Sequence, residues 1–216
     1  MNVVIQCAAS KAADAGFLMD AKGRPVFFVA NPDLAPPSDR HRYARPDDLA
    51  VPGKTWRDLL VEYNASGENP SDLLPAYRLY RHPVYQQLVE RYDIGKVFIL
   101  SAGWGLIRAD FLTANYDITF SNSAEKYKKR SKRDQYNDLC QLPDGDDEAL
   151  VFIGGKDYLA LFCQLTQGYR GERFVFYNSA SPPTASGCTF IRYPTTTRTN
   201  WHYGCARDLM SGKIGV

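Results

Sequence analysis

Short runs of apolar residues recur along this chain, and each run ends in small or polar residues. The six clearest runs cover residues 2–7, 25–30, 97–100, 149–153, 173–177 and 189–193. Apolar runs of this length without polar alternation are typical of strands buried on both faces of a sheet. The pattern therefore predicts about six strands, most of them parallel.

Segments with helical periodicity separate these runs. The hydroxyl of Thr55 can cap a helix that fades at Gly67, and His82-Pro83 opens another that leads into the run at 97–100. Further helices are expected at 71–80, 156–165 and 201–210, and one is expected within 126–140. Alternating strands and helices predict an α/β fold with helices flanking a mainly parallel central sheet.

The length of the chain favours a single domain over residues 1–216, since 216 residues suffice for one sizeable core and are short for two. Residues 31–52 contain five prolines and many charges, so this segment cannot be helical. Its length predicts an ordered surface excursion or a lid.

Composition changes this picture little. Hydrophobic residues make up 44% and charged residues 23% of the chain, as in ordinary soluble globular proteins. No apolar run approaches the roughly 18 residues that a membrane span needs, and the N-terminus enters a strand without a basic, cleavable leader. We therefore expect a cytoplasmic protein with no membrane partner.

Cysteine and histidine give no sign of a metal or redox centre. The five cysteines include no Cys-x-x-Cys pair, which favours reduced thiols, and the three histidines have no Glu or Cys at metal-ligand spacing. We expect neither a metal nor another cofactor.

Charge is more informative in its distribution than in its total. The formal net charge is only +2, yet residues 126–133 hold six basic residues in eight, and residues 144–148 form a short acidic loop. The basic residues are Lys126, Lys128, Lys129, Arg130, Lys132 and Arg133. Such a run either contacts a polyanion or forms a solvated face, which is the commoner case.

Candidate site residues follow several of the predicted strands. Ser10 and Lys11 follow the first run, Ser101 ends the third, and Asn178 follows the run at 173–177. Ligands of open parallel sheets bind beyond the carboxyl ends of the strands, so four loops are expected to converge at one edge. They are the segments 7–11, 101–117, 154–158 and 178–181.

A glycine pair marks one of these loops. Gly154-Gly155 stands between a strand and a helix that opens with Lys156, an arrangement whose free amides and helix dipole favour anions. The full Gly-x-x-x-x-Gly-Lys-Ser/Thr pattern is absent, so binding of a nucleoside triphosphate is not supported.

The spacing of these motifs resembles that of the YaaA-like peroxide-stress proteins and their small relatives. The likeness rests on Cys-x-x-Ser-Lys, then Tyr80 and Tyr85, then Leu-Ser-Ala-x-x-Gly-Leu-Ile-x-x-Asp, then Tyr-Asp and Gly-Gly-Lys-x-Tyr. It covers about residues 2–165, and residues 101–117 are its most specific part. Trp104 stands where the family usually has a tyrosine.

This resemblance implies a DNA-associated α/β domain whose fold is similar to that of uracil-DNA-glycosylase-like enzymes. Cleavage of an N-glycosidic bond passes through an oxocarbenium-like sugar that a nearby carboxylate can stabilise. Asp117, with Asp110 behind it, is the candidate catalytic pair.

The remaining candidates divide into two groups. A flipped base needs a pocket with hydrogen-bonding and stacking groups, and the expected members are Ser101, Trp104, Asn115, Tyr116, Tyr158 and Asn178. Phosphate or DNA contacts are expected from Ser10, Lys11, Gly154, Gly155, Lys156, Lys126, Lys128, Lys129, Arg130, Lys132 and Arg133. Each of these residues also has a purely structural interpretation, such as a turn cap, a packed ring or a solvated charge.

Three functions remain open. The first is a monofunctional DNA glycosylase that removes a modified or damaged base and leaves an abasic site, in repair or in defence against modified foreign DNA. The second is a non-catalytic DNA-binding stress protein, and the third is an enzyme that acts on the same bond in free nucleosides or nucleotides. DNA of unspecified strandedness is the expected partner, and the sequence indicates no protein partner.

Overall fold

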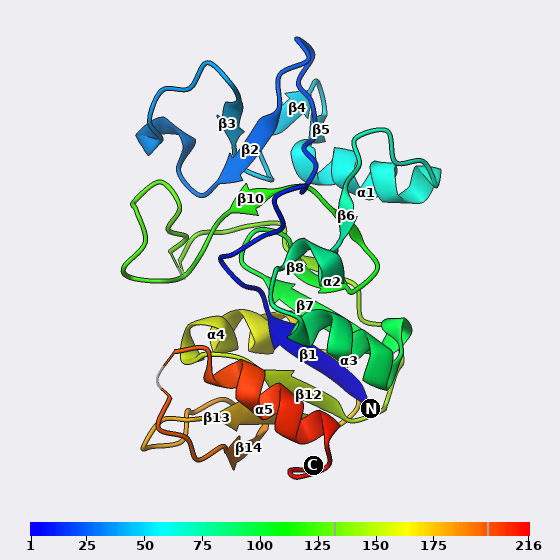
Figure 1. Ribbon diagram of the computed structural model, residues 1–216, viewed down its shortest axis with the longest axis vertical. Coiled ribbons are helices and arrows are strands. Elements are labelled where there is room, and N and C mark those ends of the chain that lie inside the picture. Colours follow the sequence, from blue (N-terminus) through cyan, green and yellow to red (C-terminus); the bar gives the residue numbers. More distant parts are fainter. Residues whose placement is uncertain (132, 198) are drawn as a thin grey trace.

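A seven-stranded sheet forms the lower part of the computed structural model, which describes residues 1–131, 133–197 and 199–216 (Figure 1). Its strand order is β11-β8-β7-β1-β12-β13-β14. The strands are β1 (Asn2–Gln6), β7 (Val97–Ser101), β8 (Gly105–Arg108), β11 (Leu139–Cys140), β12 (Leu150–Ile153), β13 (Arg173–Tyr177) and β14 (Thr189–Arg192). The α/β class and the mostly parallel central sheet agree with the prediction, with seven strands in place of about six.

Most of the sheet is parallel. β7, β1, β12, β13 and β14 run in one direction, whereas β8 turns back antiparallel to β7 and carries β11 parallel to itself. β1 lies in the middle, with β7 on one side and β12 on the other. The chain therefore winds away from β1 in both directions, and such a switch point opens a crevice at the carboxyl ends of the strands.

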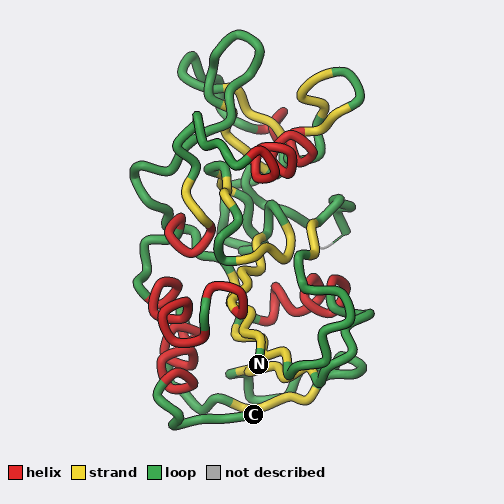
Figure 2. The backbone as a smooth tube through the Cα atoms, turned by 90° about the vertical axis from the view of Figure 1, so that its right-hand side faces the viewer, coloured by secondary structure: helices red, strands yellow, loops and turns green. Residues whose placement is uncertain are grey.

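Helices cover both faces of this sheet (Figure 2). α3 (Val84–Tyr92) precedes β7, and α5 (Trp201–Met210) packs beside it and against β12. α4 (Lys156–Leu165) connects β12 to β13 and contacts β8. Because the crossovers from β1 to β7 and from β12 to β13 run in opposite directions, the right-handed rule puts α3 and α4 on opposite faces.

The upper part of the molecule holds smaller elements (Figure 1). β10 (Tyr116–Asp117), β2 (Val26–Val29) and β3 (Arg42–Ala44) form a three-stranded parallel sheet, and β4 (Leu49–Val51) pairs with β5 (Lys54–Thr55). α1 (Trp56–Ser66) begins at Thr55 with a capping box and ends at left-handed Gly67. The remaining elements are η1 (Pro32–Leu34), β6 (Leu74–Pro75), α2 (Ala76–Leu79), η2 (Ile94–Lys96) and β9 (Leu112–Thr113).

Three expected elements differ from the structure. The helix expected at 71–80 is limited to α2, because Leu74–Pro75 pairs with β9 as strand β6. The segment 25–30 is a strand, β2, but it lies in the small sheet and not in the central one. The helix expected within 126–140 is absent from the described residues, where turns lead into β11. Leu139 pairs with Gly105 of β8 instead, and Arg130 binds the Asp138 carboxylate, so tertiary contacts replace local helical bonds.

One continuous cluster of buried apolar side chains connects the central sheet to the upper elements. Val4, Phe98 and Phe152 belong to it from the sheet, and Phe28 and Trp56 belong to it from above. Among the described residues, no helix is both long and apolar enough to span a membrane.

Candidate functional site

An open cleft of about 350 Å³ lies at the carboxyl ends of β1 and β12. Its walls come from the end of β1, the loop after β10 and the first turns of α4 and α5. The lining residues are Gln6, Cys7, Ala8, Ala9, Thr119, Ser121, Gly155, Asp157, Tyr158, Thr199, Asn200, Trp201, His202 and Tyr203. The cleft thus occupies the switch point that the strand order creates.

Two helices point their N-termini into this cleft. Gly155 is the N-cap of α4 and Asn200 the N-cap of α5, and neither caps its helix through a side-chain hydrogen bond to a described residue. The first amides of an α-helix have no partner within the helix, and the dipole makes that end positive. The Gly155 amide itself donates to the Gln6 Oε1 atom at 2.5 Å. The Tyr158 and Tyr203 amides donate to the carbonyl oxygens of Gly155 and Asn200, so the two amides before each of them are the ones that favour an anionic ligand.

Aromatic and imidazole rings surround the helix ends. Tyr158, Trp201 and Tyr203 line the cleft, and the Tyr203 ring stacks on His82 with centroids 3.7 Å apart. His202 is 3% exposed, and its Nε2 atom has no hydrogen-bond partner in the described part of the chain. Burial, aided by the charge of His82, lowers the pKa of His202 to about 4, so the ring is neutral at pH 7.

A network of buried hydroxyls lies below the cleft. The Ser101 Oγ donates to the Tyr116 hydroxyl at 2.8 Å, and the Tyr80 and Tyr116 hydroxyls are 2.8 Å apart. The Tyr158 hydroxyl lies 3.2 Å from the Cys7 Sγ atom. Burial raises the pKa of Tyr80, Tyr116 and Tyr158 well above the ordinary tyrosine value. These phenols therefore remain protonated at pH 7.

Lys11 and Asp117 lie beside the cleft. The Lys11 Nζ atom is 4.1 Å from the centroid of the Tyr116 ring and 3.4 Å from the carbonyl oxygen of Ala9, which lines the cleft. Asp117 forms an ion pair with the Lys128 Nζ atom at 2.9 Å. The structure thus brings together Lys11, Tyr116, Asp117 and Lys128 from the predicted set.

Asp110 lies elsewhere. It follows β8, whose direction is opposite to that of β7, and its neighbour Ala109 donates to the carbonyl oxygen of Val97 at the start of β7. Asp110 is therefore at the amino edge of the parallel strands, where its Oδ2 atom binds the Arg108 guanidinium at 2.6 Å. The expectation that Asp110 supports Asp117 depended on a forward strand and fails because Gly105 turns the chain back.

Trp104 and Ser101 are core residues. Both are fully buried, and the Trp104 ring packs edge-on against Phe28 at 5.0 Å. The Ser101 Oγ accepts hydrogen bonds from the backbone amides of Gly103 and Trp104, which fixes the turn after β7. These two residues shape the site from below and are not among the residues that line the cleft.

A smaller cavity of about 40 Å³ adjoins the cleft and shares Gly155 and Trp201 with it. Gly154, Lys156 and Asn178 line this second cavity, so they meet at the sheet edge as expected but across Trp201 from the main cleft. Ser10 is exposed, and Asn115 donates its amide to the Gly16 carbonyl oxygen outside both cavities.

The basic run has two kinds of members. Arg130 is 5% exposed and binds Asp138 at 2.5 Å, and Lys128 binds both Asp117 and Glu125, so these two charges are neutralised within the protein. Lys126 and Arg133 are exposed and Lys129 is half-buried. Lys132 lies outside the described residues.

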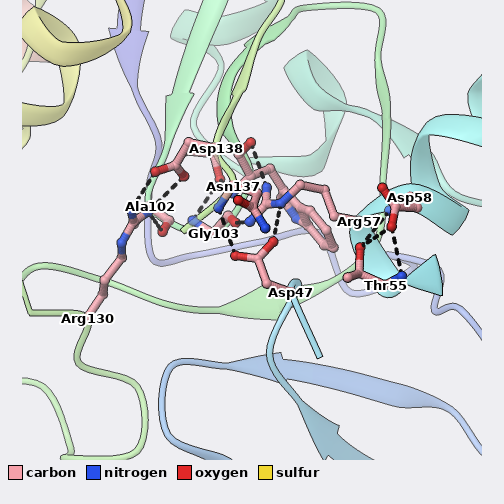
Figure 3. Close-up of polar contacts among 11 residues, drawn as sticks. Asp47, Thr55, Arg57, Asp58, Ala102, Gly103, Arg130, Asn137 and Asp138 are labelled. Carbon is pink, nitrogen blue, oxygen red and sulfur yellow. Dashed lines mark hydrogen bonds and ion pairs between the residues drawn. The ribbon is translucent and has the colours of Figure 1, made fainter. Parts of the chain in front are cut away.

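Two buried arginines hold the backbone after β7 (Figure 3). The Arg57 guanidinium, on α1, donates to the carbonyl oxygens of Gly103 and Trp104 at 3.1 and 3.0 Å and binds Asp47 at 2.6 Å. Arg130 donates to the carbonyl oxygen of Ala102 at 2.8 Å. We call Arg57 and Arg130 the arginine clamp. It ties the proline-rich segment and the basic run to the turn below the site.

The sequence reasoning missed the part of the site built by residues 199–203. A hydroxyl-rich loop before a closing helix was visible in the sequence, and the argument used for Gly154-Gly155 would have applied to it. Asp157, the carboxylate among the described lining residues, was also missed, because an acidic residue in the first turn of a helix is common and gives no separate signal of a site.

The described residues include no group of three or more His, Cys, Asp or Glu side chains arranged to hold a metal ion. Residues 65–174, just over half of the chain, match the model of a family of unknown function, DUF6884. No curated protein and no solved structure matches the chain. The family match contains β7, Asp117 and all of α4, and it stops before α5.

Proposed function

We propose that this chain, which belongs to DUF6884, a family of unknown function, hydrolyses the N-glycosidic bond of a modified or damaged base in DNA. The observation that carries the proposal is the cleft, where two helix N-termini and three aromatic rings meet. Asp117 ends β10, two residues before Thr119, which lines the cleft. The resemblance of the motifs to YaaA-like proteins, and the uracil-DNA-glycosylase-like fold that it implies, support the same function.

Each feature of the cleft has a part in this reaction. The amides of α4 and α5 receive a backbone phosphate, and Tyr158 or Trp201 stacks on a base that has left the duplex. Asp117 stabilises the oxocarbenium-like sugar and orients water, while its ion pair with Lys128 fixes the carboxylate. Asp157 lines the cleft and is the second carboxylate able to act there.

The test is base excision from DNA. The protein is incubated with single- and double-stranded oligonucleotides that carry different modified bases, and alkali then cleaves the strand at each abasic site. We expect Asp117→Asn to lower the rate by a factor on the order of 10² or more, as removal of a catalytic charge does. Asp157→Asn, measured in parallel, identifies the carboxylate that acts.

Asp110→Asn is the matched control, because it removes the same charge from the opposite edge of the sheet. Its rate should equal that of the unmodified protein. The proposal fails if no oligonucleotide yields an abasic site, or if both carboxylate variants retain full activity.

A second candidate is hydrolysis of the same bond in free nucleotides. It is favoured by the ion pairs of Arg130 and Lys128, which leave fewer charges of the basic run for a polyanion, and by a cleft large enough for one nucleotide. Release of free base from mononucleotides by a Lys126→Ala, Lys129→Ala, Arg133→Ala variant at the unmodified rate would favour this candidate over DNA.

A further inference from the structure

Lys11 occupies an unusual place for a lysine. Lys11 is half-buried at the end of the loop that follows β1, and its backbone forms an antiparallel β-bridge with Tyr80. Its Nζ atom lies over the Tyr116 ring at 4.1 Å and reaches the carbonyl oxygen of Ala9 at 3.4 Å. The amine is thus held at the rim of the cleft, against the buried hydroxyl network.

The surroundings of Lys11 lower the pKa of its amine. Burial is the main cause of this shift below the ordinary lysine value, and the weaker influence of the Lys128 charge acts in the same direction. Cys7 and Asp117 oppose the shift without reversing it. Desolvation of this kind raises the share of the neutral amine, which is the form that attacks carbonyl carbon.

Other amines near the site lack this combination. The Lys128 ammonium is bound by Asp117 and Glu125, whose hydrogen bonds raise its pKa. Lys156 is exposed at the start of α4. The Met1 amine binds Glu148 at the amino edge of the sheet, away from the cleft. Among the amines compared, Lys11 therefore combines a position at the rim of the cleft with a pKa lowered by burial.

We propose that the Lys11 amine forms a Schiff base with the aldehyde of an abasic deoxyribose, which gives the protein a DNA strand-cleaving lyase activity. The inference adds a covalent step to the proposed function and rests on it for the class of substrate. It replaces the monofunctional reaction expected from the sequence with a bifunctional one.

The chemistry balances without an oxidant or reductant. The Lys11 nitrogen adds to C1′ of the open-chain sugar, and water leaves as the iminium forms. A carboxylate, for which Asp117 is placed, accepts the C2′ proton; the released electron pair expels the 3′-phosphate and forms the C2′=C3′ bond. Water then hydrolyses the iminium, which frees Lys11 and the unsaturated aldehyde.

The experiment traps the Schiff base. The full chain is mixed with oligonucleotides that already contain an abasic site, single-stranded and duplex, and sodium cyanoborohydride reduces the iminium to a stable amine. We expect a covalent protein–DNA adduct whose peptide mass maps to Lys11. Lys11→Met should lose the adduct, whereas Lys54→Met, which removes a lysine paired with Glu62 far from the cleft, should retain it.

Mapping the adduct on the unmodified protein keeps the test independent of how well Lys11→Met folds. Absence of an adduct, or an adduct at Met1 or another lysine, overturns the inference. Base removal without a trapped adduct also overturns the lyase inference, while the proposed glycosidase activity stands. Trapping at Lys11 without removal of any base supports the inference and overturns the proposed base excision, because the abasic substrate bypasses that step.

Discussion

His202 is a buried histidine at the first turn of α5, and its Nε2 atom has no partner among the described residues. Burial depresses its pKa to about 4, against roughly 6.5 in an unfolded chain. Between these two values the unfolded state binds more protons than the folded state. The contribution of His202 to stability is therefore fully present above pH 6.5 and is lost as the pH falls toward 4.

We predict that the free energy of unfolding decreases by about 2 kcal/mol between pH 7 and pH 4.5 through His202 alone. Urea denaturation of the unmodified protein and of His202→Gln at both pH values measures this contribution, because carboxylate titration is common to both proteins. The variant should show a pH dependence smaller by that amount. Equal pH dependence in the two proteins would mean that His202 is not buried in its neutral form.

At the scale of elements, Gly105 decides the course of the chain after β7. Its φ is +94°, and a Cβ atom there would lie 2.4 Å from the carbonyl oxygen of Leu139 and 2.6 Å from the Leu139 nitrogen. The residue therefore combines a left-handed backbone with the close approach of β11. Both requirements select glycine.

We predict that Gly105→Ala destabilises the protein by more than about 2 kcal/mol, since backbone strain adds to a contact with backbone that cannot move freely. Gly53→Ala is the control: its φ of +79° is similar, but no atom lies within 4 Å of the added methyl group. It should cost only the strain, about 1 kcal/mol. Urea denaturation gives both values, and equal losses would contradict the proposed clash.

Many elements were predictable because their signals are local. The capping box at Thr55, the apolar runs of β1, β7, β12, β13 and β14, and the periodicity of α3, α4 and α5 all depend on neighbouring residues. β8 and β11 were missed because they are short and their pairing depends on Gly105 meeting Leu139, 34 positions along the chain. The same turn moved Asp110 to the wrong edge for catalysis.

The candidate site shows the same division. The convergence of the loops at 7–11, 154–158 and 178–181 followed from the parallel strands. The roles of Trp104 and Arg130 did not, because a tryptophan or arginine reads alike in sequence whether it faces a ligand or the core. Only tertiary packing shows that Trp104 lies against Phe28 and that Arg130 belongs to the arginine clamp.

At the scale of the molecule, we expect the arginine clamp to stabilise the fold and the accessible basic residues to contact DNA. Replacing Lys126, Lys129 and Arg133 with alanine should leave the melting temperature almost unchanged and weaken DNA binding. Loss of up to three phosphate contacts lowers the slope of log K against log salt by as much as about 3. Binding measured by fluorescence anisotropy between 50 and 300 mM salt tests this.

Arg130→Met is the contrasting variant. It leaves the Asp138 carboxylate buried without its partner, so we expect a loss on the order of 3–5 kcal/mol of stability. If the triple variant binds DNA with the same salt dependence as the unmodified protein, the surface of residues 126–133 is not a DNA contact.

The central position of β1 also has a consequence during synthesis. β1 leaves the ribosome before both of its partners, since β7 follows about 95 residues later and β12 about 150 residues later. At translation rates of roughly 5–20 residues per second, β12 emerges about 7–30 s after β1. The nascent chain thus carries an unpaired strand edge, open to association with other chains, until Ile153 has emerged.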